Sequence, residues 1–140
     1  MKIAMISFTG NGRRLERSLA HELEKEGHQV LQAVKCKELE SDKDAVKCSA
    51  REWTGEQIRT RDVLIFIGAV QIAVRLIASF IGSKTTDPAV LVLDEKGQYC
   101  IPILSGHIGG ANEMAERIAE MAGALPVITT ATEIRGKWAI

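Results

Sequence analysis

The segment spanning residues 104–112 holds the side chains best suited to proton transfer. It reads Leu-Ser-Gly-His-Ile-Gly-Gly-Ala-Asn. His107 is the strongest candidate for a general base, because an imidazole titrates near neutral pH and the flanking glycines leave it accessible. Ser105, two residues earlier, can donate, accept or orient a hydrogen bond. The same spacing is equally typical of a tight strand-to-helix turn in which His107 and Asn112 act as caps.

Three other segments, residues 9–12, 68–75 and 129–132, also follow predicted strands. Ligands of α/β sheets collect beyond the carboxyl ends of the strands, where loops lead into helix N-termini. Glycines let the backbone approach a ligand closely, and successive N–H groups bind anions. Arg75 adds a planar, always charged guanidinium suited to a carboxylate. The four loops together predict a site for an anionic ligand.

The first loop has a further interpretation. Thr9-Gly10 resembles the phosphate loop of flavodoxins, in which hydroxyls and backbone N–H groups hold the flavin phosphate. A turn glycine with a threonine cap is the simpler explanation. The chain is only 4% aromatic, so it is poor in rings that could stack on a flavin.

The other segments also have structural alternatives. Thr129 and Thr130 can bind a ligand carboxylate, or their hydroxyls can simply finish a strand. Asp87 and Asp94 both lie in turn-like sequence, and either can pair with Arg75 in place of a ligand.

The hydrophobic pattern predicts alternating strands and helices. Strand-like runs cover residues 2–8, 28–34, 63–67, 90–93, 99–104 and 126–130, and helical spacing covers residues 15–23, 68–81 and 113–122. A short polar segment, residues 94–98, is typical of a hairpin and predicts a mixed sheet. Half of the residues in the segment 35–62 are charged. We therefore expect this segment to leave the sheet as a solvent-exposed excursion with one short helix, and we assign it no chemistry. The pattern predicts a three-layer Rossmann-like or flavodoxin-like α/β domain with a mostly parallel sheet.

Composition excludes several classes of protein. A length of 140 residues predicts one domain, covering residues 1–140. The 18 basic residues equal the 18 acidic ones, so no global positive charge attracts nucleic acid or an anionic membrane. The longest apolar stretch, residues 63–70, is too short to span a bilayer, and no export signal is visible, so we expect a cytoplasmic location.

The cysteines predict neither a metal site nor a disulfide framework. Cys36, Cys48 and Cys100 are odd in number and lack the paired spacing of a zinc site, so we interpret them as free thiols.

Several motifs in the second half of the chain occur together in one known family. They are Gly68-Ala69, residues 72–75, Lys84 with residues 87–90, Asp94-Glu95, residues 104–112 and residues 127–132. In order and spacing they resemble the CbiG-type cobalt-precorrin-5A hydrolases of cobalamin biosynthesis, across about residues 60–133. The first half resembles the family only loosely.

The resemblance implies an enzyme of the anaerobic pathway to vitamin B12 that hydrolyses the ring-A lactone of cobalt-precorrin-5A and releases acetaldehyde, giving cobalt-precorrin-5B. The substrate is a corrinoid rich in carboxylates, and it carries the cobalt itself, so we expect no cofactor. His107 and Ser105 would be catalytic, with the backbone of residues 105–110 stabilising an oxyanion. The predicted substrate-binding residues are Thr9, Gly10, Gly68, Ala69, Arg75, Gly106, Gly109, Gly110, Asn112, Thr129, Thr130 and Thr132.

The chain departs from the family pattern in three ways. Glu133 stands where the family usually has aspartate, and Ser79-Phe80 replaces its usual alanine-proline. The family's C-terminal domain is absent, so we expect that domain or other enzymes of the pathway as partners, beside the corrinoid. Two alternatives stay open: a noncatalytic corrinoid-binding module and a flavodoxin-like protein that binds FMN.

Overall fold

A six-stranded sheet forms the middle of the computed structural model, which describes residues 1–83, 85–105 and 110–130. Its strands are β1 (Lys2–Ser7), β2 (Gln29–Val34), β3 (Val63–Ile67), β4 (Ala89–Leu93), β5 (Tyr99–Leu104) and β6 (Leu125–Pro126). They lie side by side in the order β2-β1-β3-β4-β5-β6. The pairs from β2 to β4 are parallel, β5 runs antiparallel to β4, and β6 is parallel to β5. The predicted mixed, mostly parallel sheet is confirmed.

The central strands are apolar because both of their faces are covered. Every residue of β3 and β4 is buried, and so are the last five residues of β1. Continuous aliphatic runs are typical of parallel strands with helices on both faces. The strand order 2-1-3-4-5 is that of flavodoxin-like folds, which confirms the predicted fold class.

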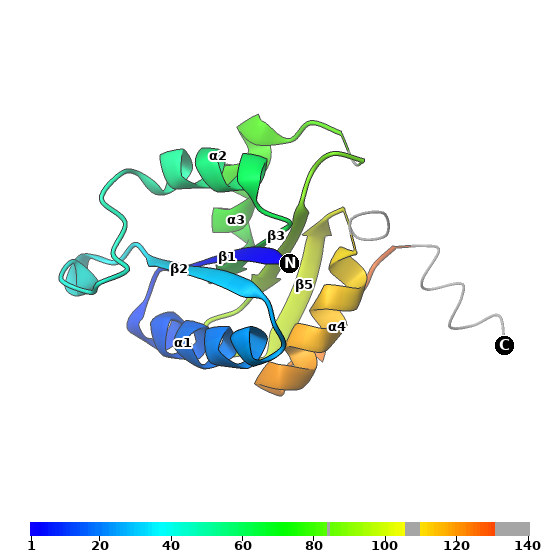
Figure 1. Ribbon diagram of the computed structural model, residues 1–140, viewed down its shortest axis with the longest axis horizontal. Coiled ribbons are helices and arrows are strands. Elements are labelled where there is room, and N and C mark those ends of the chain that lie inside the picture. The colour runs from blue at the N-terminus through cyan, green and yellow to red at the C-terminus, as the bar shows by residue number, and fades with distance from the viewer. Residues whose placement is uncertain (84, 106–109, 131–140) are drawn as a thin grey trace, which may run out of the picture.

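Four helices complete the three layers (Figure 1). They are α1 (Gly10–Lys25), α2 (Ala50–Thr60), α3 (Val70–Ile77) and α4 (Ala111–Ala122). Helices α1 and α4 cover one face of the sheet, and α2 and α3 cover the other. No helix among the described residues is long and apolar enough to cross a membrane.

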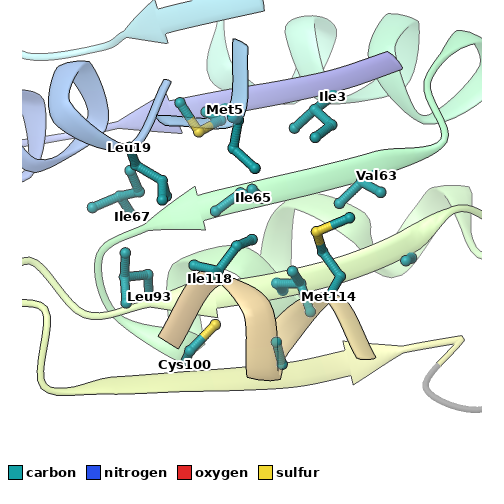
Figure 2. Close-up of a cluster of buried hydrophobic side chains, with 14 of the residues drawn as sticks. Ile3, Met5, Leu19, Val63, Ile65, Ile67, Leu93, Cys100, Met114 and Ile118 are labelled. Carbon is teal, nitrogen blue, oxygen red and sulfur yellow. The ribbon is translucent and has the colours of Figure 1, made fainter. Parts of the chain in front are cut away.

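A separate hydrophobic core fills each interface between sheet and helices. Figure 2 shows the core beneath α1 and α4, where Leu19 and Ile118 pack toward Met5, Ile65 and the neighbouring strands. Both helical residues are at most 2% exposed. The second core lies under α2 and α3 and is built around an edge-to-face contact between Trp53 and Phe66, with ring centroids 6.5 Å apart. Burial on both sides makes the sheet a fixed platform for the loops at its edges.

Two predicted elements are shorter than expected. The helix predicted over residues 68–81 is α helical only as α3, and a 3₁₀ turn, η2 (Ala78–Phe80), follows it. The tighter turn seats the ring of Phe80 against Gly55 of α2, where a Cβ would lie 2.9 Å from the ring. The strand predicted over residues 126–130 pairs with β5 only as β6, and its last bond to β5 runs from Val127 N to the Cys100 carbonyl, 2.9 Å away.

Candidate functional site

The strand directions separate the four predicted loops into two groups. The loops after β1 and β3 lie at the carboxyl edge of the parallel strands. The loops after β5 and β6 lie at the opposite edge, because these two strands run antiparallel to β4. The expectation that all four loops share one edge is therefore wrong. The sequence showed that a hairpin was present, but not which strand ran against the sheet.

At the opposite edge, the described residues bring Ser105, Asn112 and Thr130 close to the start of β4. The Ser105 hydroxyl donates to the carbonyl of Asp87, 3.2 Å away, and Ser105 has a positive φ of 57°. Asn112, only 3% exposed, donates from Nδ2 to Oγ1 of Thr130 at 2.9 Å. Its Oδ1 is buried and accepts no hydrogen bond from any described residue. These contacts tie the end of β5 to the segment before β4, and the first turn of α4 to the segment after β6.

Helix α4 begins at this edge. Gly110 is its N-cap, with a φ of 81°, and offers no side-chain hydrogen bond to the helix. The alternative in which Asn112 caps the helix does not occur, since Asn112 lies inside α4 and donates to Thr130. The predicted residues Gly106, His107, Gly109 and Thr132 lie outside the described residues.

At the carboxyl edge, Thr9 is the N-cap of α1, as the simpler interpretation of this loop expected. Its Oγ1 accepts a hydrogen bond from the Gly12 N–H at 3.0 Å and donates to Oε2 of Glu95 at 2.5 Å. The Glu95 carboxylate thus occupies the position at which a flavin phosphate would meet the threonine hydroxyl. Like charges disfavour a phosphate there, which counts against the FMN alternative. The neighbouring Gly10 is exposed and begins the helix.

The loop after β3 leads to a groove along α3, which we call the α3 groove. It has a volume of about 640 Å³ and is lined by Val70, Gln71, Ile72, Val74 and Arg75. Volumes of this size are ordinary for small-molecule sites. The three aliphatic side chains are 37%, 39% and 49% exposed in chain order, which is unusual for a helix that packs on a sheet. The groove is an apolar surface with one cation on it.

Arg75 has no hydrogen-bond or ion-pair partner among the described residues. The alternatives in which it pairs with Asp87 or Asp94 do not occur. Asp87 accepts from the Gly82 N–H at 3.0 Å, and Asp94 accepts backbone N–H groups in the β4–β5 turn, the shortest from Tyr99 at 2.6 Å. The guanidinium is therefore available to a ligand. The other predicted residues of this loop, Gly68 and Ala69, connect β3 to α3, with Ala69 as the N-cap.

Sequence analysis missed a buried ionic network between α1 and the excursion after β2. Arg13 is 3% exposed and donates from Nε and Nη2 to both carboxylate oxygens of Asp42, at 3.0 and 2.9 Å. It also donates to Asp44 at 2.6 Å, Gln32 at 2.9 Å and Glu16 at 3.2 Å. These five bonds use all five donors of the guanidinium. Asp42 and Asp44 lie 29 and 31 residues after Arg13 in the sequence, so no local spacing could reveal the network.

The network shifts the pKa values of two of its carboxyl groups in opposite directions. Glu16 is fully buried, and burial raises its pKa to about 7, although hydrogen bonds from Ser7, Ala33 and Arg13 act in the other direction. The hydrogen bonds from Arg13 lower the pKa of Asp42 to about 2. Burial acts to lower the pKa of Arg13, but its bonds to the carboxylates outweigh that effect and raise it. The hydrogen bonds of this cluster connect α1, β2 and the excursion.

The three cysteines are free thiols, as predicted. Cys100 is buried under α4, and burial raises its pKa to about 12, so the thiol stays protonated. Among the described residues no three histidine, cysteine, aspartate or glutamate side chains are grouped to hold a metal ion.

The fold and the groove define a class: a flavodoxin-like α/β domain with an apolar, arginine-bearing surface suited to an organic anion. A sequence profile of the family described as "Cobalamin synthesis G N-terminal" (CbiG_N) matches residues 52–133, more than half of the chain. The chain belongs to this family. The matched range includes the α3 groove and the loop before α4, but neither Thr9 nor Arg13.

Individual relatives agree with this assignment. The cobalt-precorrin-5A hydrolase of Salmonella typhimurium is 56% identical over 75 residues, which cover 54% of this chain and 21% of the relative. The enzyme of the same name from Priestia megaterium is 51% identical over 73 residues, covering 52% and 19%. A crystal structure of a cobalamin biosynthesis protein G homolog from Sulfolobus solfataricus superposes with a TM-score of 0.73 and 25% identity, covering 96% of this chain and 39% of that one. The matched part spans about a fifth of the curated relatives' length.

Proposed function

We propose that this chain serves cobalamin biosynthesis as the N-terminal part of a cobalt-precorrin-5A hydrolase. The proposed reaction is hydrolytic opening of the ring-A lactone of cobalt-precorrin-5A, with release of acetaldehyde, to give cobalt-precorrin-5B. Family membership and the relatives named cobalt-precorrin-5A hydrolase support it. The cobalt enters as part of the substrate, so the chain supplies no metal ligand. We further propose that the reaction takes place in the cytoplasm.

The observation that carries the proposal is Arg75 in the α3 groove, which has no partner among the residues that the structure describes. A corrinoid presents a broad apolar surface bordered by acetate and propionate carboxylates. The aliphatic side chains of Val70, Ile72 and Val74 can cover part of the apolar surface, while the guanidinium binds a carboxylate through two parallel hydrogen bonds. Gln71, one turn before Arg75, can donate to the same group.

The hydrolytic step needs a base and a donor to the oxyanion. We propose His107 as the base that removes a proton from water as the water attacks the lactone carbonyl. The acyl C–O bond then breaks, which leaves a carboxylate and an alcohol. Acetaldehyde is released when this alcohol loses its proton, its oxygen becomes the aldehyde carbonyl and the C–C bond to the macrocycle breaks, with the electron pair of that bond passing to the macrocycle. Backbone N–H groups of the loop before α4, next to the start of the helix, would stabilise the oxyanion, because a helix N-terminus carries partial positive charge. Ser105 would position this loop through its bond to Asp87.

The threonines after β6 fit a supporting role in substrate binding. Thr130 already bonds to Asn112, so its hydroxyl lies beside the start of α4. Thr129 is exposed. We propose that a C-terminal domain partners this chain in the complete enzyme, because the matched part covers about a fifth of the curated relatives.

The direct test is anaerobic incubation of the chain with cobalt-precorrin-5A, with and without the C-terminal domain of a relative, while acetaldehyde is trapped. Acetaldehyde release in either mixture is expected, and release only with the added domain would assign a divided active site. Corrinoid binding without release in either mixture would replace the proposal with the noncatalytic binding module.

Arg75→Gln tests the groove separately. Loss of a charge-assisted bidentate contact should weaken corrinoid binding about tenfold or more. Arg59→Gln is the matched control, because Arg59 is also exposed on a helix but lies outside the groove. Binding is followed by the visible absorption of the corrinoid. Equal effects of the two substitutions would remove the α3 groove from the substrate site.

A further inference from the structure

A second pocket lies at the carboxyl end of β2, away from the α3 groove. Its volume is about 410 Å³, within the range of small-molecule sites. The end of β2 and the excursion after it form its walls. Val34, Ala45 and Val46 contribute apolar surface, and Lys35, Lys37 and Lys47 contribute charge. Lysines are common on protein surfaces, but these three line one pocket.

Two of the three pocket lysines, Lys35 and Lys47, are held in place by backbone carbonyls without being neutralised. The ammonium of Lys35 donates to the carbonyls of Val46 and Cys48, at 3.2 and 2.9 Å. The ammonium of Lys47 donates to the carbonyl of Glu40 at 3.4 Å. Each ammonium has three donors, so Lys35 keeps one and Lys47 keeps two. Neither lysine, nor Lys37, forms an ion pair with any described carboxylate.

The described carboxylates of the same excursion form no ion pair with these lysines. Asp42 and Asp44 pair with Arg13, and Asp42 also pairs with Arg17 at 2.8 Å. Glu38 accepts at 3.1 Å from the thiol of Cys36, which lines the pocket, so this carboxylate lies near the pocket although it does not line it. Glu40 is the one carboxylate among the residues that line the pocket, against three lysines. The pocket therefore carries an excess of positive charge in a chain whose formal net charge is zero.

The walls of the pocket are fixed before any ligand binds. Val34 and Ala45 form an isolated parallel β-bridge, with hydrogen bonds from Val34 N to the Asp44 carbonyl at 3.0 Å and from Val46 N to the Val34 carbonyl at 2.9 Å. The buried Arg13 network anchors the same segment to α1. A site whose charges are already positioned loses less conformational entropy on binding.

We propose that this pocket binds a small multivalent oxyanion, with at least two carboxylate or phosphate groups on a short carbon or phosphorus body. Two separated anionic groups would bind the ammonium groups of Lys37 and Lys47, and the apolar surface would contact the body between them. Lys35 would complete the coordination with its remaining donor. This proposal is independent of the function proposed for the α3 groove.

The test is titration of the ¹⁵N-labelled chain with tricarballylate and, separately, with pyrophosphate, followed through the backbone amide signals of residues 34–47. Saturable shifts of these signals are expected with one or both probes. The stronger probe identifies the source of the anion as an organic acid or a phosphate compound. The trimethyl ester of tricarballylate has the same carbon body without the charge and should cause no saturable shift.

Lysine variants locate the binding. The double substitution Lys37→Gln with Lys47→Gln should weaken binding about tenfold or more, because each charge-assisted hydrogen bond is strong. Lys37→Arg with Lys47→Arg keeps the charge and should bind within about threefold of the original, which separates charge loss from misfolding. Lys43→Gln removes a lysine of the same excursion that does not line the pocket, and it should change the affinity less than about twofold. No saturable shift with either probe, or an equal loss from Lys43→Gln, would overturn the proposal.

Discussion

Arg13 and Arg75 each lie on a helix that follows a parallel strand, yet their surroundings are opposite. Arg13 is buried, and every donor of its guanidinium is used within the chain. Arg75 is exposed beside apolar side chains and has no partner among the described residues. The first arginine joins segments of the chain, whereas the second is available to something outside it. The same residue type thus holds segments of the chain together at one position and is proposed to bind a ligand at the other, and burial with bonded partners distinguishes the two.

The largest effect should come from Arg13→Met. The substitution keeps the length of the side chain but leaves Glu16, Asp42 and Asp44 without their shared cation. Breaking a buried ion pair in this way costs about 3–5 kcal/mol of unfolding free energy, which urea titration measures. Arg17→Met is the control, since Arg17 is 58% exposed, and it should cost less than about 1 kcal/mol. An equal loss of unfolding free energy from both variants would contradict the distinction between a buried arginine that joins segments of the chain and an arginine on the surface.

The next effect concerns pH. The pKa of Glu16 is raised in the folded chain to about 7 from an ordinary value of 4.5. Between these values the folded state keeps a proton that the unfolded state has released. This contribution to stability is complete below pH 4.5 and is lost as the pH rises through about 7, and it amounts to at most about 3 kcal/mol.

Glu16→Gln isolates that contribution, because glutamine has the same shape and does not titrate. The urea midpoint of the original chain should fall relative to that of the variant as pH increases from 4.5 to 7. The other titratable groups are common to both proteins and cancel in the difference. Parallel pH curves for the two proteins would show that Glu16 stays ionised in its buried position.

The smallest effect on stability should come from Arg75→Gln. The side chain is exposed and bonds to no described residue, so the unfolding free energy should change by no more than about 0.5 kcal/mol. Urea titration of this variant beside Arg13→Met makes the comparison between the two arginines quantitative. A loss above about 1 kcal/mol would mean that Arg75 has a structural partner and is not reserved for a ligand.

Local patterns predicted most of the architecture. The buried run of β3, the leucines of α1 and the polar turn between β4 and β5 each identify their element from neighbouring residues alone. Arg75 was predicted as a binding group from its planar, always charged guanidinium and its place after a predicted strand, and that role stays a prediction. Local patterns could not predict the direction of a strand or the contacts between residues that are far apart in the sequence. The reversal of β5 moved Ser105 and Thr130 to the other edge, and the partners of Arg13 lie in a segment that looked merely solvated.

The margins of the sheet have a consequence for self-association. At one margin the end of β2 is paired through the Val34–Ala45 bridge, and at the other β6 covers β5 with only two residues. An outer strand with a long row of free amides is a template for adding a strand from another copy, which is a route to aggregation. Here the bridge blocks one end of β2, and the outermost strand beyond β5 is too short to present such a row. The part of β5 that β6 leaves uncovered is residues 101–104, and Pro102 within it has no N–H to offer an added strand, so the uncovered row of donors is short and interrupted.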